Sequence, residues 1–328
     1  MRRRKLLLSM GGARMQQSGK GYKGRRKERK LKKKLVYILI FGISLIWGLS
    51  FIALTVLLRW LDPLQIIAVR WTLASCIFIA LMAAGKFRID IKRKSFRLLV
   101  LAGMIEPGMY SVFEVYGLYY TSPSISSIFI ATIPCMSLIL GFLFFKMRTT
   151  KTGIVSILVA FAGVAVCTYF DPRFSSGGNL KGYGFMVCAV IAGSLFSFVS
   201  AKASKDYSAI EITTMMAFVG SIGFNVVNVA RGSFIRSYCA VFENWEVAAG
   251  ILFLAVFCSA LCYIGLNKVL AVLNPAIANN MIGSSITVIG VIAGVLINGD
   301  HAGAHTLIGV SLTVIGVWLS SKGIEETE

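Results

Sequence analysis

Ten long apolar segments occupy most of the chain beyond residue 34, and no other feature of the sequence limits its fold as strongly. A helix needs about 20 apolar residues to cross the hydrocarbon core of a bilayer. Backbone groups inside lipid must be satisfied by the protein itself, which favours helices. We therefore predict an all-α integral membrane protein with ten transmembrane helices. The segments are Leu35–Leu58, Leu64–Ala84, Phe96–Tyr120, Ser124–Phe145, Gly153–Phe170, Gly182–Ser200, Ile212–Ala230, Val247–Leu266, Leu273–Ile297 and Thr306–Ser321.

The residues before the first apolar segment are strongly basic. The stretch 1–34 carries 15 of the 34 Lys and Arg residues, so much of the net charge of +20 lies at one end of the chain. A basic tail could bind RNA or anionic lipid. We expect instead that 1–34 is a disordered cytoplasmic tail that helps to hold its end inside, and we expect no nucleic-acid partner.

Positive charge outside the tail is also uneven. If 1–34 is inside and the segments alternate in direction, 28 Lys and Arg residues fall on the inner side, 13 of them beyond the tail, against 5 on the outer side, while Arg70 lies within a segment. The positive-inside rule then predicts that both termini are cytoplasmic, including the acidic end 323–328. We expect a multi-pass protein of the inner (cytoplasmic) membrane.

The third segment carries two acidic residues at membrane depth. Glu106, Tyr110 and Glu114 are four residues apart, so they share one broad helix face, and Pro107 should bend the helix beside them. A carboxylate costs roughly 2.5–3.5 kcal/mol at the centre of a membrane helix, and such residues usually face a bundle interior or a wet cavity. We predict that this face lines a transport pathway. The alternative is that the two carboxyls are protonated or paired for packing alone.

Arg70 lies in the second segment at about the same predicted depth as Glu114 in the third. Because either charge alone is expensive in lipid, we predict an Arg70–Glu114 ion pair, which would form an outer gate or hold an amino acid's carboxylate and ammonium. The alternative for Arg70 is that it snorkels to the outer headgroups. Met216 and either Cys262 or Tyr263 occupy the matching positions in the second half of the chain. Glu106, nearer the middle, is the candidate proton carrier, although proton coupling stays open.

The ninth segment contains two adjacent amides, Asn279 and Asn280. Polar side chains within a span need partners, and a substrate could be one of them. Gly290 and Gly294 form a Gly-x-x-x-Gly pattern that predicts close helix contact, either within one subunit or between the subunits of a homodimer.

The ten segments divide into two sets of five, 35–170 and 171–322. Leu61-Asp62-Pro63 after the first segment matches Tyr207-Ser208-Ala209 after the sixth, and Pro123 matches Pro275. An odd number of spans in each set makes the second half insert upside down relative to the first. We therefore predict two inverted five-helix repeats, an arrangement typical of secondary transporters, whose substrate site lies between the halves near the midplane.

Several motifs resemble one transporter family. Trp47-Gly48-Leu49-Ser50-Phe51 resembles the opening motif of the EamA-type transporters of the drug/metabolite transporter superfamily. Tyr116-Gly117-Leu118-Tyr119-Tyr120-Thr121-Ser122-Pro123, followed by Pro134, resembles that family's junction between the third and fourth helices. Gly309 to Gly316 resembles its last helix. The resemblance covers about Leu35 to Ser321.

The resemblance implies two five-helix repeats around a central cavity, with Trp47 and Ser50 in the cavity wall. It also implies export or facilitated movement of amino acids, related metabolites or drugs. The sequence departs from the family at Lys146 and Met147, where an acidic residue often stands; the counterpart after the ninth segment is Asp300.

No motif favours an enzyme or a primary pump. The sequence shows no phosphate loop, and His301 and His305 near Asp300 are interpreted as surface residues, so we expect no metal and no cofactor.

The sequence predicts a secondary transporter that moves small metabolites, amino acids or related amphipathic compounds, by alternating access and in the direction of efflux. The partners expected are a small-molecule substrate and membrane lipid. The alternative is a flippase or scramblase for lipid-linked or drug-like substrates.

Overall fold

A computed structural model describes residues 36–90, 96–145, 150–170, 180–300 and 303–325 of the chain. The basic tail 1–34, His301, Lys146 and Met147 lie outside the described residues, as does 326–328 of the acidic end. Contacts divide the chain into two units, Met1–Ile40 and Phe41–Glu328. In the first unit the described residues, 36–40, are helical. The arrangement described below is that of the second unit.

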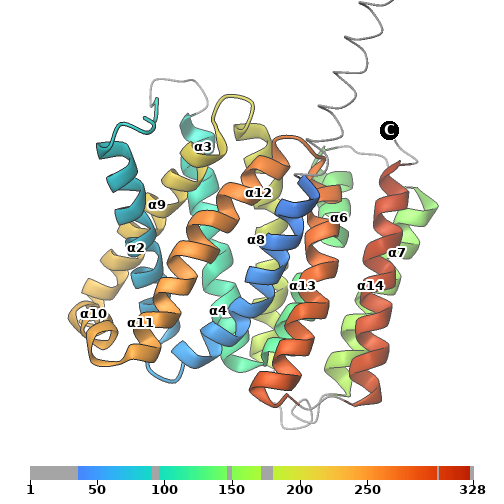
Figure 1. Ribbon diagram of the computed structural model, residues 1–328. Helices are drawn as coiled ribbons and strands as arrows, with labels where there is room; N and C mark the ends of the chain where they lie inside the picture. Colours follow the sequence, from blue (N-terminus) through green and yellow to red (C-terminus); the bar gives the residue numbers. More distant parts are fainter. Residues whose placement is uncertain (1–35, 91–95, 146–149, 171–179, 301–302, 326–328) are drawn as a thin grey trace, which may run out of the picture. The chain divides into compact units, whose positions relative to one another are not determined.

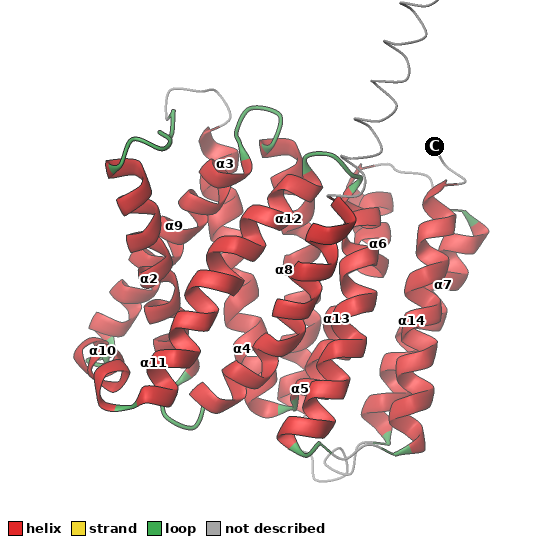
Figure 2. Cartoon of the chain, viewed as in Figure 1, coloured by secondary structure: helices red, strands yellow, loops and turns green. Residues whose placement is uncertain are grey.

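The described part of the chain is helical and contains no strand, as predicted (Figure 2). Nine of its helical segments are long and apolar enough to cross a membrane, and a tenth helix carries a shorter apolar stretch, Ala304–Leu319. The first of the nine is Val36–Leu57. The other elements are α2 (Pro63–Ala83), α3 (Phe96–Gly103), η1 (Met104–Met109), α4 (Tyr110–Tyr120), α5 (Pro123–Ile130), α6 (Ile133–Phe145), α7 (Lys151–Tyr169), α8 (Leu180–Ala203), α9 (Ala209–Ala230), α10 (Phe234–Glu243), α11 (Trp245–Leu252), η2 (Phe253–Cys262), α12 (Tyr263–Leu270), α13 (Pro275–Asn298) and α14 (Ala304–Glu325).

The matched stretches of the two halves begin equivalent helices. Asp62 caps α2, because its carboxylate accepts the N–H of Leu64 at 3.1 Å while the side chain of Gln65 accepts the N–H of Asp62 at 3.0 Å. Ser208 and Glu211 form the same reciprocal cap on α9. Each capping box satisfies backbone donors that the first helical turn leaves unpaired. The sequence repeat therefore corresponds to a repeat of local structure.

Two spans are interrupted by wider, π-helical turns: η1 in Phe96–Tyr120 and η2 in Trp245–Leu270. Within η1 the backbone leaves the helical region at Glu106, where φ is −131° and ψ is 113°. A residue that precedes proline is restricted to extended conformations, so Pro107 explains the break. The bend predicted at Pro107 is confirmed. Irregular backbone at membrane depth is tolerated where it is buried in protein or lines a cavity. The two interruptions therefore indicate where a functional cavity is to be sought.

Helices of the first half pack mainly against helices of the second half. The pairs are α2 with α9, α4 with α8, α5 with α13 and α7 with α14 (Figure 1). Gly163 and Gly309 allow α7 and α14 to touch, since a Cβ at Gly163 would lie 2.5 Å from the carbonyl oxygen of Gly309. At Gly290 a Cβ would lie 2.5 Å from the Cβ of Ser127, so this part of the Gly-x-x-x-Gly pattern serves contact within the chain.

Candidate substrate cavity

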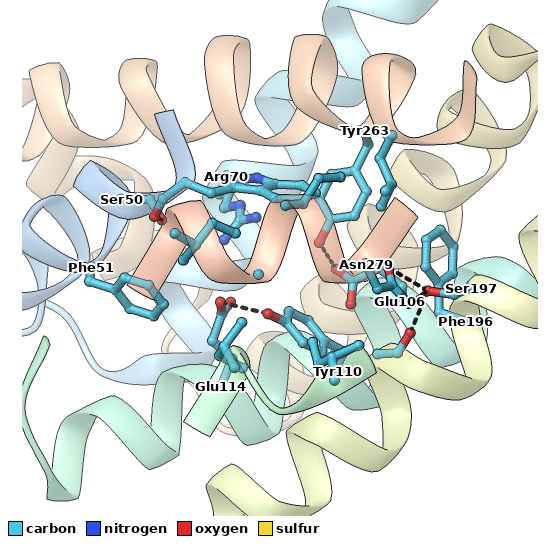
Figure 3. Close-up of a pocket in the computed structure, with 18 residues that line it drawn as sticks. Ser50, Phe51, Arg70, Glu106, Tyr110, Glu114, Phe196, Ser197, Tyr263 and Asn279 are labelled. Atoms are coloured by element: carbon cyan, nitrogen blue, oxygen red, sulfur yellow. Dashed lines mark hydrogen bonds between the residues drawn. The ribbon is translucent and has the colours of Figure 1, made fainter. Parts of the chain in front are cut away.

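A cavity lies among helices of both halves, and seven of the eight predicted site residues line it (Figure 3). It contains about 730 Å³ of empty space, counting the part that is open to the outside. The seven are Trp47, Ser50, Arg70, Glu106, Tyr110, Glu114 and Asn279. They come from the first described helix, α2, η1, α4 and α13, and residues of α5, α6, α8 and α12 also line the cavity. The sequence thus identifies most of the polar lining.

Glu114 lines the cavity, and one of its carboxylate oxygens accepts a hydrogen bond from a residue of the same helix. The hydroxyl of Tyr110 donates to Oε1 of Glu114 at 3.0 Å, one turn earlier in α4. The side chain of Glu114 is buried, and Oε2 bonds to no described residue. A hydrogen bond to a charged acceptor is stronger than one between neutral groups, so Tyr110 fixes the carboxylate and leaves one oxygen for another partner.

Arg70 also lines the cavity, but the predicted ion pair between Arg70 and Glu114 is wrong for this structure. Nε of Arg70 donates to Oγ of Ser259 in η2 at 2.6 Å, and the guanidinium carbon lies 5.4 Å from the ring centre of Trp71. Among the described residues, no carboxylate oxygen lies within 4.0 Å of Arg70. Figure 3 shows Arg70 and Glu114 facing the same space from different helices.

The reason for the difference is the position of η2. It packs against α2 and supplies Ser259, so the nearest polar partner of Arg70 comes from the second half. Arg70 is 3% exposed, so it does not snorkel to the surface. Its two terminal nitrogens bond to no described residue.

Glu106 is the most enclosed carboxylate of the site. The hydroxyl of Tyr263 donates to its Oε1 at 2.5 Å, and Oγ of Ser111 donates to the same oxygen at 3.1 Å. Oε2 is buried and has no hydrogen-bond partner among the described residues. A buried acceptor without a partner is costly, and this oxygen distinguishes Glu106 from the other polar residues that line the cavity.

Tyr263 holds this arrangement in place through its ring. The ring centre lies 5.2 Å from that of Trp47, 5.6 Å from that of Trp71 and 6.1 Å from that of Phe196. Aromatic pairs at these distances prefer edge-to-face or tilted arrangements such as these. Tyr263 was not predicted as a site residue. Its place in the second half opposite Glu114 was the signal that could have identified it.

Trp47 and Ser50 form the part of the wall that comes from the first described helix. The indole N–H of Trp47 donates to the carbonyl oxygen of Cys258, in η2, at 3.3 Å. Ser50 donates to the carbonyl oxygen of Trp47 at 2.7 Å. The indole of Trp47 therefore links the first half to the second, because its N–H is bonded to the backbone of η2.

The two adjacent amides have different surroundings. Nδ2 of Asn279 lies 2.8 Å from Oγ of Ser197, and both residues line the cavity. Asn280 does not line it, because its amide nitrogen donates to the carbonyl oxygen of Val317 in α14. Neighbouring helical residues point about 100° apart, so only one of the two can face the same space. Ser197, which was not predicted as a site residue, belongs to the wall.

The described residues contain no group of three His, Cys, Asp or Glu side chains that could hold a metal ion. The terminal nitrogens of Arg70 and the Oε2 atoms of Glu106 and Glu114 bond to no described residue, and aromatic rings and isoleucines line the same cavity. Such a wall can bind a small molecule that carries charge at one end and apolar surface at the other.

Comparison with known proteins gives a consistent result. The model of the EamA-like transporter family matches residues 34–169 and 180–322. An "Uncharacterized transporter" of Archaeoglobus fulgidus is 28% identical over 176 residues, which cover 54% of this chain and 61% of that protein. "Uncharacterized transporter YcxC" of Bacillus subtilis is 24% identical over 226 residues, 68% of this chain and 72% of that protein.

A solved structure supports the fold. A chain described as "Crystal structure of protein" superposes with a TM-score of 0.63, covering 90% of this chain and 99% of that one. The sequence identity is 15%, so the likeness concerns the fold alone.

Proposed function

Because this chain belongs to the EamA-like transporter family, we propose that it is a secondary transporter that exports small amphipathic metabolites, amino acids or related compounds. Transport proceeds by alternating access between the two inverted halves. Its membrane is the cytoplasmic membrane, with both termini on the cytoplasmic side, in keeping with the excess of Lys and Arg on that side.

The cavity wall is the observation that carries this proposal. The terminal nitrogens of Arg70 and Oε2 of Glu114 bond to no described residue although both side chains are buried. A zwitterion supplies what each lacks, a carboxylate for Arg70 and an ammonium for Glu114. Isoleucines of the wall, Ile130, Ile133, Ile282 and Ile286, provide apolar surface for the rest of the molecule.

Glu106 is the acid that would couple transport to protons. It is 1% exposed, both of its donors bond to Oε1, and Oε2 has no partner among the described residues. Ionisable groups inside a membrane protein often serve as proton relays. A proton on Oε2 would be exchanged when the cavity opens to one side.

The test is a screen of amino acids and related metabolites with purified protein in liposomes, with and without a pH gradient. We expect a zwitterionic compound to be taken up in a protein-dependent way, and a pH gradient to drive its accumulation. In Glu106→Gln the gradient should lose its effect while exchange without a gradient remains. An equal effect of the gradient in this variant would rule out Glu106 as the proton carrier, and absence of any uptake of zwitterions would contradict the proposed substrate class.

A flippase for lipid-linked or drug-like compounds is distinguished in the same vesicles. Protein-dependent movement of a labelled lipid, without uptake of zwitterions, would favour the flippase. Deleting Arg2 to Lys30 should leave uptake unchanged, because these residues precede the first apolar segment of the sequence.

A further inference from the structure

The short helix α10 (Phe234–Glu243) lies between two membrane spans and is not itself one. Its ten residues extend about 15 Å, too short to cross a bilayer. It begins a few residues after α9 ends at Ala230, and α11 begins at Trp245 immediately after it. Figure 1 shows it beside α11, at the end of the bundle opposite to the C-terminus. Both of its ends are therefore held where a span leaves the membrane.

A surface ion pair indicates where water begins at this end of the bundle. Arg231, just after α9, lies 3.1 Å from Asp62, the cap of α2, and the two side chains are 42% and 36% exposed. Charged caps of two spans that are paired and exposed belong at the polar level of the membrane rather than in hydrocarbon. Because α10 starts three residues after Arg231, it lies close to that level.

The exposed surface of α10 has an apolar side and a charged side. Ile235 is 75% exposed and Phe242 is 90% exposed, and residues seven apart lie on one face of a helix. Arg236 and Glu243, also seven apart and exposed, lie about 100° further round. Trp245, at the start of α11, is 78% exposed.

The remaining side of α10 is fixed to the bundle. Ser237 is fully buried, and the hydroxyl of Tyr238 lies 2.9 Å from Oγ1 of Thr72 in α2 and 2.8 Å from Oδ1 of Asn225 in α9. Nδ2 of Asn225 in turn donates to Thr72 at 2.7 Å. These bonds set the rotation of α10 about its axis, so the directions of its two exposed sides are defined.

We infer that α10 is an interfacial helix whose partner is the phospholipid bilayer that surrounds this chain. Ile235, Phe242 and Trp245 enter the boundary between headgroups and acyl chains, while Arg236 and Glu243 face water. This is the pattern of a helix that lies in the membrane plane, and tryptophan is enriched at the same level. Arg236 forms no ion pair with a described residue, so it is free to bind a lipid phosphate. The inference does not depend on which substrate is transported.

The test measures depth with single nitroxide labels on the full-length protein in phosphatidylcholine vesicles. Cys76, Cys188 and Cys239 are the exposed cysteines, and each is replaced by serine. Five variants then carry one label each: Ile235→Cys, Phe242→Cys, Arg236→Cys, Glu243→Cys and, as a reference inside the hydrocarbon, Ile222→Cys on the exposed face of α9. Collisions with oxygen report lipid, and collisions with a neutral nickel complex report water.

We expect the ratio of oxygen to nickel collisions to be several-fold higher at 235 and 242 than at 236 and 243, and highest at 222. Native Cys239, labelled in the protein with only Cys76→Ser and Cys188→Ser, probes α10 without altering it and should give an intermediate ratio. Equal access of nickel to all four positions would overturn the inference, because α10 would then lie in water. Shielding of 235 and 242 from both reagents, or dipolar coupling between labels of two copies, would also overturn it, because a protein would then cover this face.

Discussion

The two halves of the chain share a fold but contribute different chemistry to the cavity. Among the described lining residues, the first half supplies the one basic and the two acidic side chains, Arg70, Glu106 and Glu114. The second half supplies neutral hydroxyl, amide and aromatic groups, among them Tyr263 and Ser197. An inverted repeat therefore constrains where helices lie, while each copy is free to specialise in the side chains that it presents.

The contacts between the halves indicate what the neutral half does. Ser259 bonds to Arg70 and Tyr263 bonds to Glu106, so residues of the second half orient the charges of the first. Groups held by such a supporting shell keep their geometry while a substrate binds. If this division is correct, removal of a charge in the first half should cost more than removal of its partner in the second.

The largest effect is expected from Glu114→Gln, which removes the carboxylate proposed to bind an ammonium group. Loss of a hydrogen bond to a charged group is worth roughly 1.5–3 kcal/mol, or about 10- to 100-fold in apparent affinity. Uptake by vesicles at several substrate concentrations measures it. Glu211→Gln is the matched control, because Glu211 is a buried carboxylate of the second half that caps α9 away from the cavity. Glu211→Gln should lower thermal stability and leave the apparent affinity unchanged. Equal loss of affinity in both variants would contradict the different roles of the two halves.

Tyr263→Phe should have the next largest effect. The ring keeps its contacts with Trp47, Trp71 and Phe196, but Glu106 loses its shortest hydrogen bond. We expect a loss of roughly 1.5 kcal/mol, about tenfold in the rate driven by a pH gradient. Tyr238→Phe removes a hydroxyl outside the cavity and should leave this rate as it is. A wild-type rate in Tyr263→Phe would show that the second half does not position Glu106.

Ser259→Ala should have a smaller effect, because Arg70 keeps its charge and its contact with Trp71. Ser259 acts on the substrate only through Arg70, so we expect less than the loss of a direct bond to a charged group, about 1 kcal/mol, which predicts a fall of about fivefold in apparent affinity. Ser285→Ala, which removes a hydroxyl bonded only to its own helix at Met281, is the control. Matching effects of the two substitutions would mean that Ser259 does not orient Arg70.

The smallest effect on transport is expected from the pair of adjacent amides. Asn279→Ala removes a polar group of the cavity wall and should change apparent affinity by less than Ser259→Ala does. Asn280→Ala removes the bond to Val317 between α13 and α14, so it should lower the melting temperature and spare affinity. Uptake measurements should show the larger loss of affinity for Asn279→Ala, and thermal unfolding in detergent should show the larger loss of stability for Asn280→Ala. A larger loss of affinity in Asn280→Ala would contradict the placement of Asn279 in the wall.

The sequence predicts the spans, the inverted repeat and most of the polar lining because each depends on a one-dimensional pattern. Segment length gives the spans, and a carboxylate within a span marks an interior face. Pro107 gives the break at Glu106 for an equally local reason.

Contacts around the site could not be predicted because they depend on rotation of each helix about its axis. Arg70 and Glu114 lie at similar predicted depth, but depth does not determine which neighbour each side chain meets. The π-helical turn η2 places Ser259 against Arg70. The composition of Phe253–Cys262 does not predict such a turn. Tyr263 follows this turn, so its matching position in the repeat could mark it as a site residue but could not predict its hydrogen bond to Glu106.

A structure of the protein with a transported compound bound is the most direct measurement. The charged end of the compound should lie between the terminal nitrogens of Arg70 and Oε2 of Glu114, with its apolar part against the isoleucines of the wall and with Tyr263 still bonded to Glu106. A compound bound away from Arg70 and Glu114, or in a groove open to lipid, would contradict both the proposed site and the division of labour between the two halves.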